Sequence, residues 1–331
     1  MTSKNTKILL SVIIISSLLI YRCSDSTSGN DKTAPELSWQ EINGFENQRI
    51  FSINIDVSGI IYVVTDQSSI SFSKDNGNSW EAASDTTYNG YIRGLAFNNS
   101  GDIFIFNNGG VYKTRDIEGH WQKILDVGEK MIHLVLADGN NLYTITSSDL
   151  YMSQDNGLTW ENKGPLPTTG YSYYRSITRT PKDKIILGTN GFGVYSLSED
   201  HNSWEGINDL IETYIESFTT DLKDNIFAVG NYQGPVYRSD DKGDSWQQVS
   251  IISSDTFKLI SNKNNNLFAA TYDKGVLRST DRAESWQSVS DGLPEMLIFS
   301  IAIDQSGYIY TGDGNSVEPK GLFRTTISSA Y

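Results

Sequence analysis

The chain has 331 residues, of which 38% are hydrophobic, 11% aromatic and 20% charged, and this composition is typical of a globular protein rather than a disordered or fibrous one. Its formal net charge of −14 argues against a nucleic-acid partner, because binding to a phosphate backbone requires clustered lysine and arginine. The single cysteine excludes an intramolecular disulfide, and the three histidines lack metal-binding spacing. We therefore expect neither a metal nor a cofactor.

The N-terminus has the features of an export signal followed by a tether. Lys4 and Lys7 precede an uncharged apolar run that is shorter than the about 20 residues of a membrane-spanning helix. The run ends just before Cys23, and this arrangement resembles a bacterial lipoprotein signal. The resemblance implies a signal peptide over 1–22, lipidation of Cys23, a flexible linker over 23–36 and a place in the bacterial cell envelope as an outer-membrane lipoprotein, periplasmic or surface-exposed. An uncleaved signal-anchor helix or an ordinary secretory signal is the alternative.

Seven tryptophans divide the rest of the chain into repeats. Successive members are 39 to 44 residues apart, and they are Trp39, Trp80, Trp121, Trp160, Trp204, Trp246 and Trp286. The pattern Ser-x-Asp-x-Gly-x-Ser/Thr-Trp surrounds three of them, with its aspartates at Asp75, Asp155 and Asp241. A fourth copy, at Asp281, has alanine in place of glycine. An internal period of this length is the signature of a repeat architecture.

This unit resembles the Asp-box, or bacterial neuraminidase repeat, of the sialidase-like β-propellers. An aspartate followed two residues later by glycine predicts a tight turn in which the carboxylate accepts backbone N–H groups, while the tryptophan supplies a large buried surface. We expect the aspartates and tryptophans to be structural, and these are Asp75, Trp80, Asp155, Trp160, Asp241, Trp246, Asp281 and Trp286. Catalytic acids or calcium ligands are the alternative roles for the aspartates.

The repeats predict an all-β, seven-bladed β-propeller over 37–331. Each repeat contains four short β-branched or aromatic runs bounded by turn residues, without a helical period between them. The last repeat has only three such runs, and the segment around Trp39 matches the missing outer strand. We therefore expect the N-terminal strand to complete the C-terminal blade, which protects the sheet edges and favours a monomer.

The candidate ligand site lies where the innermost strands begin, at the channel mouth. Aligning these starts places Phe51, Arg93, Ile132, Arg175, Glu216, Phe257 and Phe299 in one column and Ser52, Gly94, His133, Ser176, Ser217, Lys258 and Ser300 in the next. The preceding loops are rich in tyrosine, and residues 312–320 form the longest loop between second and third strands. The predicted ligand-binding residues are Arg93, His133, Tyr174, Arg175, Glu216, Lys258 and Asp313.

We expect a membrane-tethered binding or scaffold module that recognises a glycan or a protein on this face, because aromatic side chains beside a few polar groups suit either ligand. The family resemblance raises an enzymatic alternative, a sialidase-like or other exo-glycosidase with its site at the channel mouth. A glycosidase needs two facing carboxylates, for which Asp66, Glu216 and Asp313 are candidates, but no spacing singles out a pair. A purely structural envelope protein is a third possibility.

Overall fold

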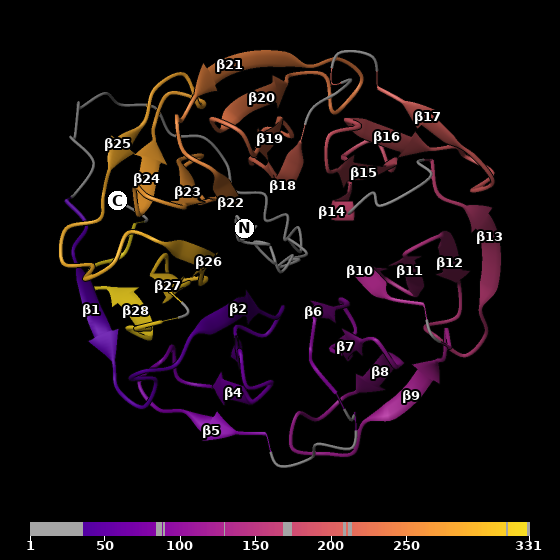
Figure 1. The fold of residues 1–331 in the computed structure, drawn as a ribbon, viewed down its shortest axis with the longest axis horizontal. Coiled ribbons are helices and arrows are strands. Elements are labelled where there is room, and N and C mark those ends of the chain that lie inside the picture. The colour runs from indigo at the N-terminus through magenta and orange to yellow at the C-terminus, as the bar shows by residue number, and fades with distance from the viewer. Residues whose placement is uncertain are drawn as a thin grey trace, which may run out of the picture.

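The computed structural model describes residues 36–329 except 84–87, 89, 129, 168–173, 208–209, 211–213 and 316. The predicted signal peptide, Cys23 and all but the last residue of the predicted linker lie outside the described residues. The described part contains 28 β-strands in seven antiparallel sheets of four strands each, and none of it is α-helix. The sheets stand around a central axis as the blades of a propeller (Figure 1).

Each blade, numbered 1 to 7 along the chain by its innermost strand, runs outward from the channel in sequence order, except that the first strand of the chain is the outermost strand of blade 7. The innermost strands are β2 (Ile50–Ile55), β6 (Gly94–Phe97), β10 (Ile132–Asp138), β14 (Tyr174–Arg179), β18 (Ile215–Thr220), β22 (Thr256–Ser261) and β26 (Ile298–Ile303). The second strands are β3 (Ile61–Thr65), β7 (Ile103–Asn107), β11 (Asn141–Thr146), β15 (Ile185–Thr189), β19 (Ile226–Gly230), β23 (Leu267–Thr271) and β27 (Ile309–Asp313).

The outer half of each blade is shorter and more polar. The third strands are β4 (Ile70–Ser73), β8 (Gly110–Thr114), β12 (Asp149–Ser153), β16 (Val194–Leu197), β20 (Pro235–Ser239), β24 (Val276–Ser279) and β28 (Leu322–Thr325). The outermost strands are β5 (Glu81–Ala82), β9 (Gln122–Leu125), β13 (Glu161–Pro165), β17 (Trp204–Gly206), β21 (Gln247–Ile251), β25 (Gln287–Ser288) and β1 (Trp39–Ile42).

The ring closes as the sequence predicts. β1 pairs with β28 in blade 7, with Trp39 opposite Thr325 and Ile42 opposite Leu322, so the first strand of the chain lies beside the last (Figure 1). The predicted all-β, seven-bladed propeller with an N-terminal closing strand is therefore confirmed. This pairing leaves no blade with a missing strand.

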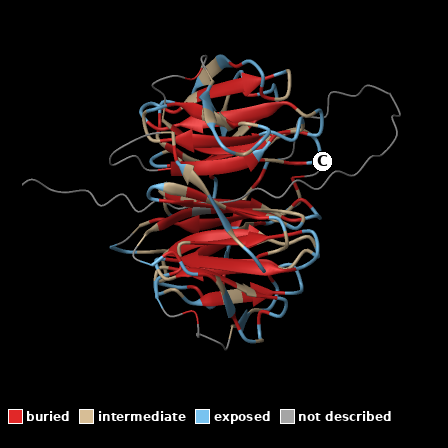
Figure 2. Ribbon diagram, turned by 90° about the vertical axis from the view of Figure 1, so that its right-hand side faces the viewer, coloured by how far each residue is buried: buried red, intermediate tan, exposed pale blue. Residues whose placement is uncertain are grey.

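The core lies between neighbouring blades. All five residues of β3 are buried, whereas both residues of β5 are exposed, and the same gradient from inside to outside recurs around the ring (Figure 2). The second strand of a blade is covered on both faces by adjacent blades, which is why it is a continuous run of apolar residues rather than an alternating one. Six clusters of buried side chains fill the interfaces.

The antiparallel order sorts the connections onto two faces. We call the face at which the innermost strands begin the top face; it also carries the turns between second and third strands. The turns between third and outermost strands, which contain the Asp-x-Gly motifs, lie on the opposite, bottom face. The motif that marks the repeats is thus separated from the channel mouth by the height of the blades.

The four aspartates of the repeated motif lie in these bottom turns and accept hydrogen bonds from them. Asp155 accepts the backbone N–H of Thr159 at 2.8 Å and its hydroxyl at 2.6 Å, and the Ser153 hydroxyl donates to the same carboxylate while accepting the N–H of Gly157. Equivalent bonds surround Asp75, Asp241 and Asp281. In the turn before Trp204 only part of this pattern is present. The Ser198 hydroxyl donates to the Asp200 carboxylate and accepts the backbone N–H of Ser203.

Candidate functional site

A β-bulge at the top of the innermost strands builds the channel mouth. In six blades the register between first and second strands skips one residue, as between Ile50 and Ser52 or between Ile215 and Ser217. Such a bulge re-aims the side chain of the skipped residue. In blade 2 the equivalent residue is Arg93, whose N–H bonds to the carbonyl of Phe106. We call this set the mouth ring: Phe51, Arg93, His133, Arg175, Glu216, Phe257 and Phe299.

The bulge corrects one sequence alignment. The spacing of apolar residues places Ile132 in the first column and His133 in the second, whereas the register skips His133 and pairs Ile132 with Thr146. His133 therefore belongs to the mouth ring. The skipped residue shifts the strand by one position, and hydrophobic periodicity does not reveal such a shift.

One sector of the mouth ring is apolar. Phe257 and Phe299, on neighbouring blades, meet edge to face with their ring centroids 4.6 Å apart. Phe51 on the next blade contacts the ring of Tyr91 at 5.7 Å, and the Arg49 guanidinium lies 4.7 Å from the centroid of Phe299. Blades 6, 7 and 1 thus contribute the aromatic side of the mouth ring, in which Phe257 and Phe299 are half-buried and Phe51 is fully buried.

The other sector, on blades 2 to 5, is charged. The Nε of Arg175 lies 3.4 Å from Oε1 of Glu216, and the Asn231 amide donates to the same oxygen at 2.6 Å. Arg93 donates from Nε to the Asn108 side chain at 2.7 Å. The mouth ring therefore has an aromatic half and a polar half.

Burial and neighbouring charge change the ionisation of this sector. Burial raises the pKa of Glu216 to about 6, although the nearby Arg175 opposes the shift and Asp255 adds to it. Burial lowers the pKa of His133 to about 4, and the positive charges of Arg93 and Arg175 act in the same direction. His133 is therefore neutral at pH 7, and its ring contacts Tyr174 edge to face.

A second set of residues supports the mouth ring, and two of its members, Asn108 and Asn231, were missed by sequence reasoning. Asn108 and Asn231 each follow the second strand of their blade, 15 positions after the mouth-ring residue that they bond. Tyr272 lies 15 positions after Phe257 and contacts its ring. Gly314 lies 15 positions after Phe299, and a Cβ added there would lie 2.7 Å from the ring of Phe299. The fixed separation of 15 residues, given the strand assignments, is the sequence signal that identifies these partners.

Exposed apolar side chains gather on the top face. Ten large apolar side chains are exposed in the described residues. Seven belong to connections or strand ends at the top face: Tyr91, Phe192, Tyr232, Ile251, Tyr272, Met296 and Val317. The other three, Leu158, Leu222 and Ile327, lie at the bottom. Tyr232 is 71% exposed although its φ of 59° is unfavourable for a tyrosine, which is the kind of backbone strain that clusters at binding sites.

The remaining predicted site residues have different surroundings. Tyr174, expected in a loop, is the buried first residue of β14. Asp313 is buried at the end of β27, where its carboxylate accepts the backbone N–H groups of Asn315 and Lys320 and so braces the loop that follows. Lys258 lies one position below the mouth ring, on the wall of the channel. The structure thus brings together Arg93, His133, Arg175 and Glu216 but not Asp313.

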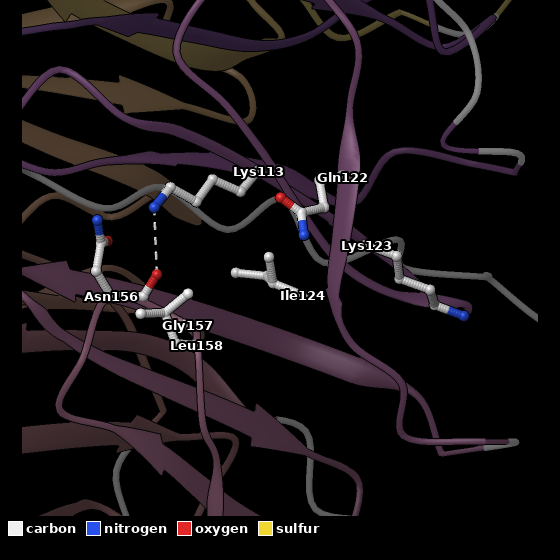
Figure 3. Close-up of a pocket in the computed structure, with 7 residues that line it drawn as sticks. All are labelled: Lys113, Gln122, Lys123, Ile124, Asn156, Gly157 and Leu158. Atoms are coloured by element: carbon white, nitrogen blue, oxygen red, sulfur yellow. Dashed lines mark hydrogen bonds between the residues drawn. The ribbon is translucent and has the colours of Figure 1, made fainter.

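A separate pocket of about 170 Å³ lies between blades 2 and 3, away from the mouth ring (Figure 3). It is lined by Lys113, Gln122, Lys123, Ile124, Asn156, Gly157 and Leu158. The ammonium of Lys113 bonds to the Asn156 carbonyl at 3.3 Å, and this links the third strand of one blade to the bottom turn of the next. The pocket contains none of the residues predicted to bind a ligand.

Two kinds of feature are absent from the described residues. They contain no group of three or more His, Cys, Asp or Glu side chains arranged to hold a metal ion. Within the same ranges, no helix has the length and apolar character required to cross a membrane.

Comparison with known proteins supports the fold. A family model described as the DUF6242 beta propeller domain matches residues 33–193, slightly less than half of the chain. No curated protein matches the chain. The solved structures that align with this chain have low sequence identity to it, so they show a similarity of fold alone.

Three solved structures illustrate that similarity. A structure of YCF48 bound to D1 peptide aligns with a TM-score of 0.68 and 15% identity, covering 90% of this chain and 98% of the other. Virginiamycin B lyase from Staphylococcus aureus aligns with a TM-score of 0.71 and 12% identity, covering 88% and 99%. The extracellular domain of the putative one component system BT4673 from B. thetaiotaomicron aligns with a TM-score of 0.68 and 15% identity, covering 88% of this chain and 40% of that one.

Proposed function

We propose that the protein is a binding module whose top face holds a segment of a partner protein across the channel mouth. The observation that carries this proposal is the gathering of exposed aromatic and aliphatic side chains on the top face, the face that carries the mouth ring. Contiguous exposed apolar surface on a soluble domain marks an interaction site, and rigid loops on a closed ring are suited to present it.

The division of the mouth ring favours a peptide over a neutral glycan. A peptide offers side chains for the aromatic sector of Phe257 and Phe299 and polar or charged groups for the sector of Arg93 and Glu216. A neutral glycan would leave the charged sector without complementary charge. The YCF48 structure, which contains a D1 peptide, is a propeller of similar fold with a peptide ligand.

The test is selection of peptides against the whole protein. A displayed library of random dodecapeptides is enriched on the immobilised chain, and the affinities of the selected peptides are measured by fluorescence anisotropy. Tyr232→Ala and Tyr272→Ala should each weaken binding by about tenfold or more, as for an aromatic hot spot, whereas Leu222→Ala on the bottom face should leave it unchanged. Failure to enrich any peptide, or equal binding by all three variants, would contradict the proposal. Binding to a glycan array that depends on the same two tyrosines would show that the ligand is a sugar and not a peptide.

A glycoside hydrolase at the channel mouth is the second candidate. Glu216 is a buried carboxyl with a pKa raised to about 6, a property required of a general acid, and Asp255 is a carboxylate close enough to influence it. The ion pair with Arg175 and the hydrogen bond from Asn231 tie Glu216 to the protein instead of leaving it free for substrate. Hydrolysis of sialyl or β-glucan substrates that disappears in Glu216→Gln would favour this candidate.

We also propose that a lipid on Cys23 tethers the propeller to the membrane of a bacterial cell envelope. Support comes from the sequence around Cys23, and from the similarity of the domain to an extracellular domain of a bacterial protein. Metabolic labelling with a palmitate analogue should tag the wild-type chain and not Cys23→Ala. Equal labelling of both would exclude lipidation at this residue.

A further inference from the structure

Lys258 places a buried ammonium on the wall of the channel. It lies on β22 in blade 6, its residue is 5% exposed, and its Nζ donates to the carbonyl oxygen of Ile53 at 3.4 Å, the long end of the hydrogen-bond range. Ile53 belongs to β2 in blade 1, so the lysine side chain passes the innermost strand of blade 7 to reach it.

The surroundings of Lys258 are almost free of charge. The strands packed against β22 are β18, β19, β23 and β26, and their only ionisable side chain is Glu216, which is engaged by Arg175 and Asn231. β2, which supplies the Ile53 carbonyl, has no ionisable side chain. Asp255, just before β22, accepts the backbone N–H of Tyr232. No carboxylate of the described residues lies within ion-pair distance of the Lys258 Nζ. Burial alone lowers the pKa of Lys258 to about 7.

Four other blades show what a structural residue looks like at this position. The same register position holds Ser52, Ser176, Ser217 and Ser300. The Ser300 hydroxyl accepts the N–H of Ile53 at 2.8 Å and the Ser217 hydroxyl accepts that of Leu259 at 3.2 Å, so these serines join innermost strands of adjacent blades. A serine at 258 would suffice for that purpose, whereas a buried cation without a counter-ion costs stability. The cost is understandable if a ligand supplies the missing charge.

Small residues surround Lys258 at its own level of the ring. Five of the other six blades have serine or glycine at this register position, namely Ser52, Gly94, Ser176, Ser217 and Ser300, and blade 3 has Leu134.

We propose that Lys258 is the cationic centre of a second binding site, in the channel below the mouth ring, which takes a small carboxylate. A monoanion balances the single ammonium, and its oxygens accept charge-assisted hydrogen bonds from the two N–H groups that Ile53 does not use. The site goes beyond the proposed peptide binding and does not depend on it, because it requires none of the exposed aromatic side chains.

The test uses sodium acetate as the probe and the whole chain at pH 6, with thermal unfolding and the NMR signal of the Lys258 ammonium as readouts. Acetate should raise the melting temperature of the wild type with saturation, and the affinity should fall about tenfold for each pH unit above 7, because a neutral amine does not bind the anion. Lys258→Ser and the isosteric Lys258→Met should abolish the saturable response while melting, without acetate, at or above the wild-type temperature. Tyr232→Ala should respond like the wild type.

Several results would overturn this inference. One is the absence of a saturable acetate response in the wild type, and another is the same response in Lys258→Ser. An equal response to sodium chloride would show that the occupant is not a carboxylate. A lower melting temperature of both Lys258 variants without acetate would show that the lysine is a structural strut to Ile53.

Discussion

The indole N–H of Trp39 donates a 2.6 Å hydrogen bond to the carbonyl oxygen of Val289, 250 positions later in the chain. Trp39 begins β1 in blade 7, and Val289 directly follows β25 in blade 6. The backbone N–H of Trp39 bonds in addition to the carbonyl of Asp291, and its strand pairs with β28. One residue at the start of the domain therefore closes the last blade and fastens it to the preceding blade.

This relationship predicts that Trp39→Ala destabilises the whole ring. Trp39 is buried, so we expect a loss of about 3–5 kcal/mol in the free energy of unfolding, from the cavity and the missing closure. Trp204→Ala is the matched control, because Trp204 begins an outermost strand but is only partly buried, and it should cost less. Chemical denaturation followed by tryptophan fluorescence measures both. A loss for Trp39→Ala no larger than for Trp204→Ala would contradict this role.

Gly312 allows blade 7 to approach blade 1, and Gly312→Ala should be destabilising. A Cβ at this position would lie 2.4 Å from the Cβ of Ile50 on the neighbouring innermost strand, a distance that requires the strands to move. We expect a loss of about 1–3 kcal/mol, as for overpacking of a core. Gly206→Ala is the control, because its nearest neighbour would be a Tyr195 ring atom at 3.7 Å, an ordinary contact. Equal thermal stability of the two variants would show that the interface yields easily.

The bottom turns should make the fold sensitive to acid. Hydrogen bonds from the turn lower the pKa values of Asp75, Asp155 and Asp241 to about 2. A carboxyl group whose pKa is lower in the folded than in the unfolded state stabilises the fold at pH values above its unfolded-state pKa. That stabilisation is lost as the pH falls from about 4 toward 2. Asp241→Ala should lower the melting temperature by a few degrees at pH 7 and progressively less toward pH 2, without affecting ligand binding. A difference that is independent of pH would mean that the carboxylate charge does not stabilise the turn.

Glu216→Gln should change the pH dependence of stability in the opposite sense. The pKa of Glu216 is raised to about 6, so the folded state holds its proton more tightly than the unfolded state, and the wild type loses stability as the pH rises from 4.5 through 6. The amide remains neutral, so Glu216→Gln should gain about 2 kcal/mol relative to the wild type across this window. Urea denaturation at pH 4 and pH 7 measures the change. The raised pKa of Glu216 already includes the opposing effect of the Arg175 charge. If Glu216→Gln were less stable than the wild type at pH 7, the ion pair with Arg175 would outweigh the cost of burying the carboxylate.

The candidate site was only partly predictable from the sequence. Arg93, Arg175 and Glu216 follow from aligning strand starts, because the repeat length places equivalent residues at equivalent heights. His133 was assigned one position too low, since a β-bulge adds a residue that hydrophobic periodicity does not register. Asp313 is polar and close to the mouth in the alignment, but its carboxylate is occupied by the amides of its own loop.

The sequence by itself determined the number of blades, the all-β fold and the closing strand, because turn residues and tryptophans act locally and recur with every repeat. Only the tertiary structure decided which side chains share a wall of the channel and which of them lack a counter-charge. Burial and electrostatics at Lys258 depend on Ile53, which is 205 positions away. Such terms arise only when distant segments exclude water from the same place, and no local pattern records them.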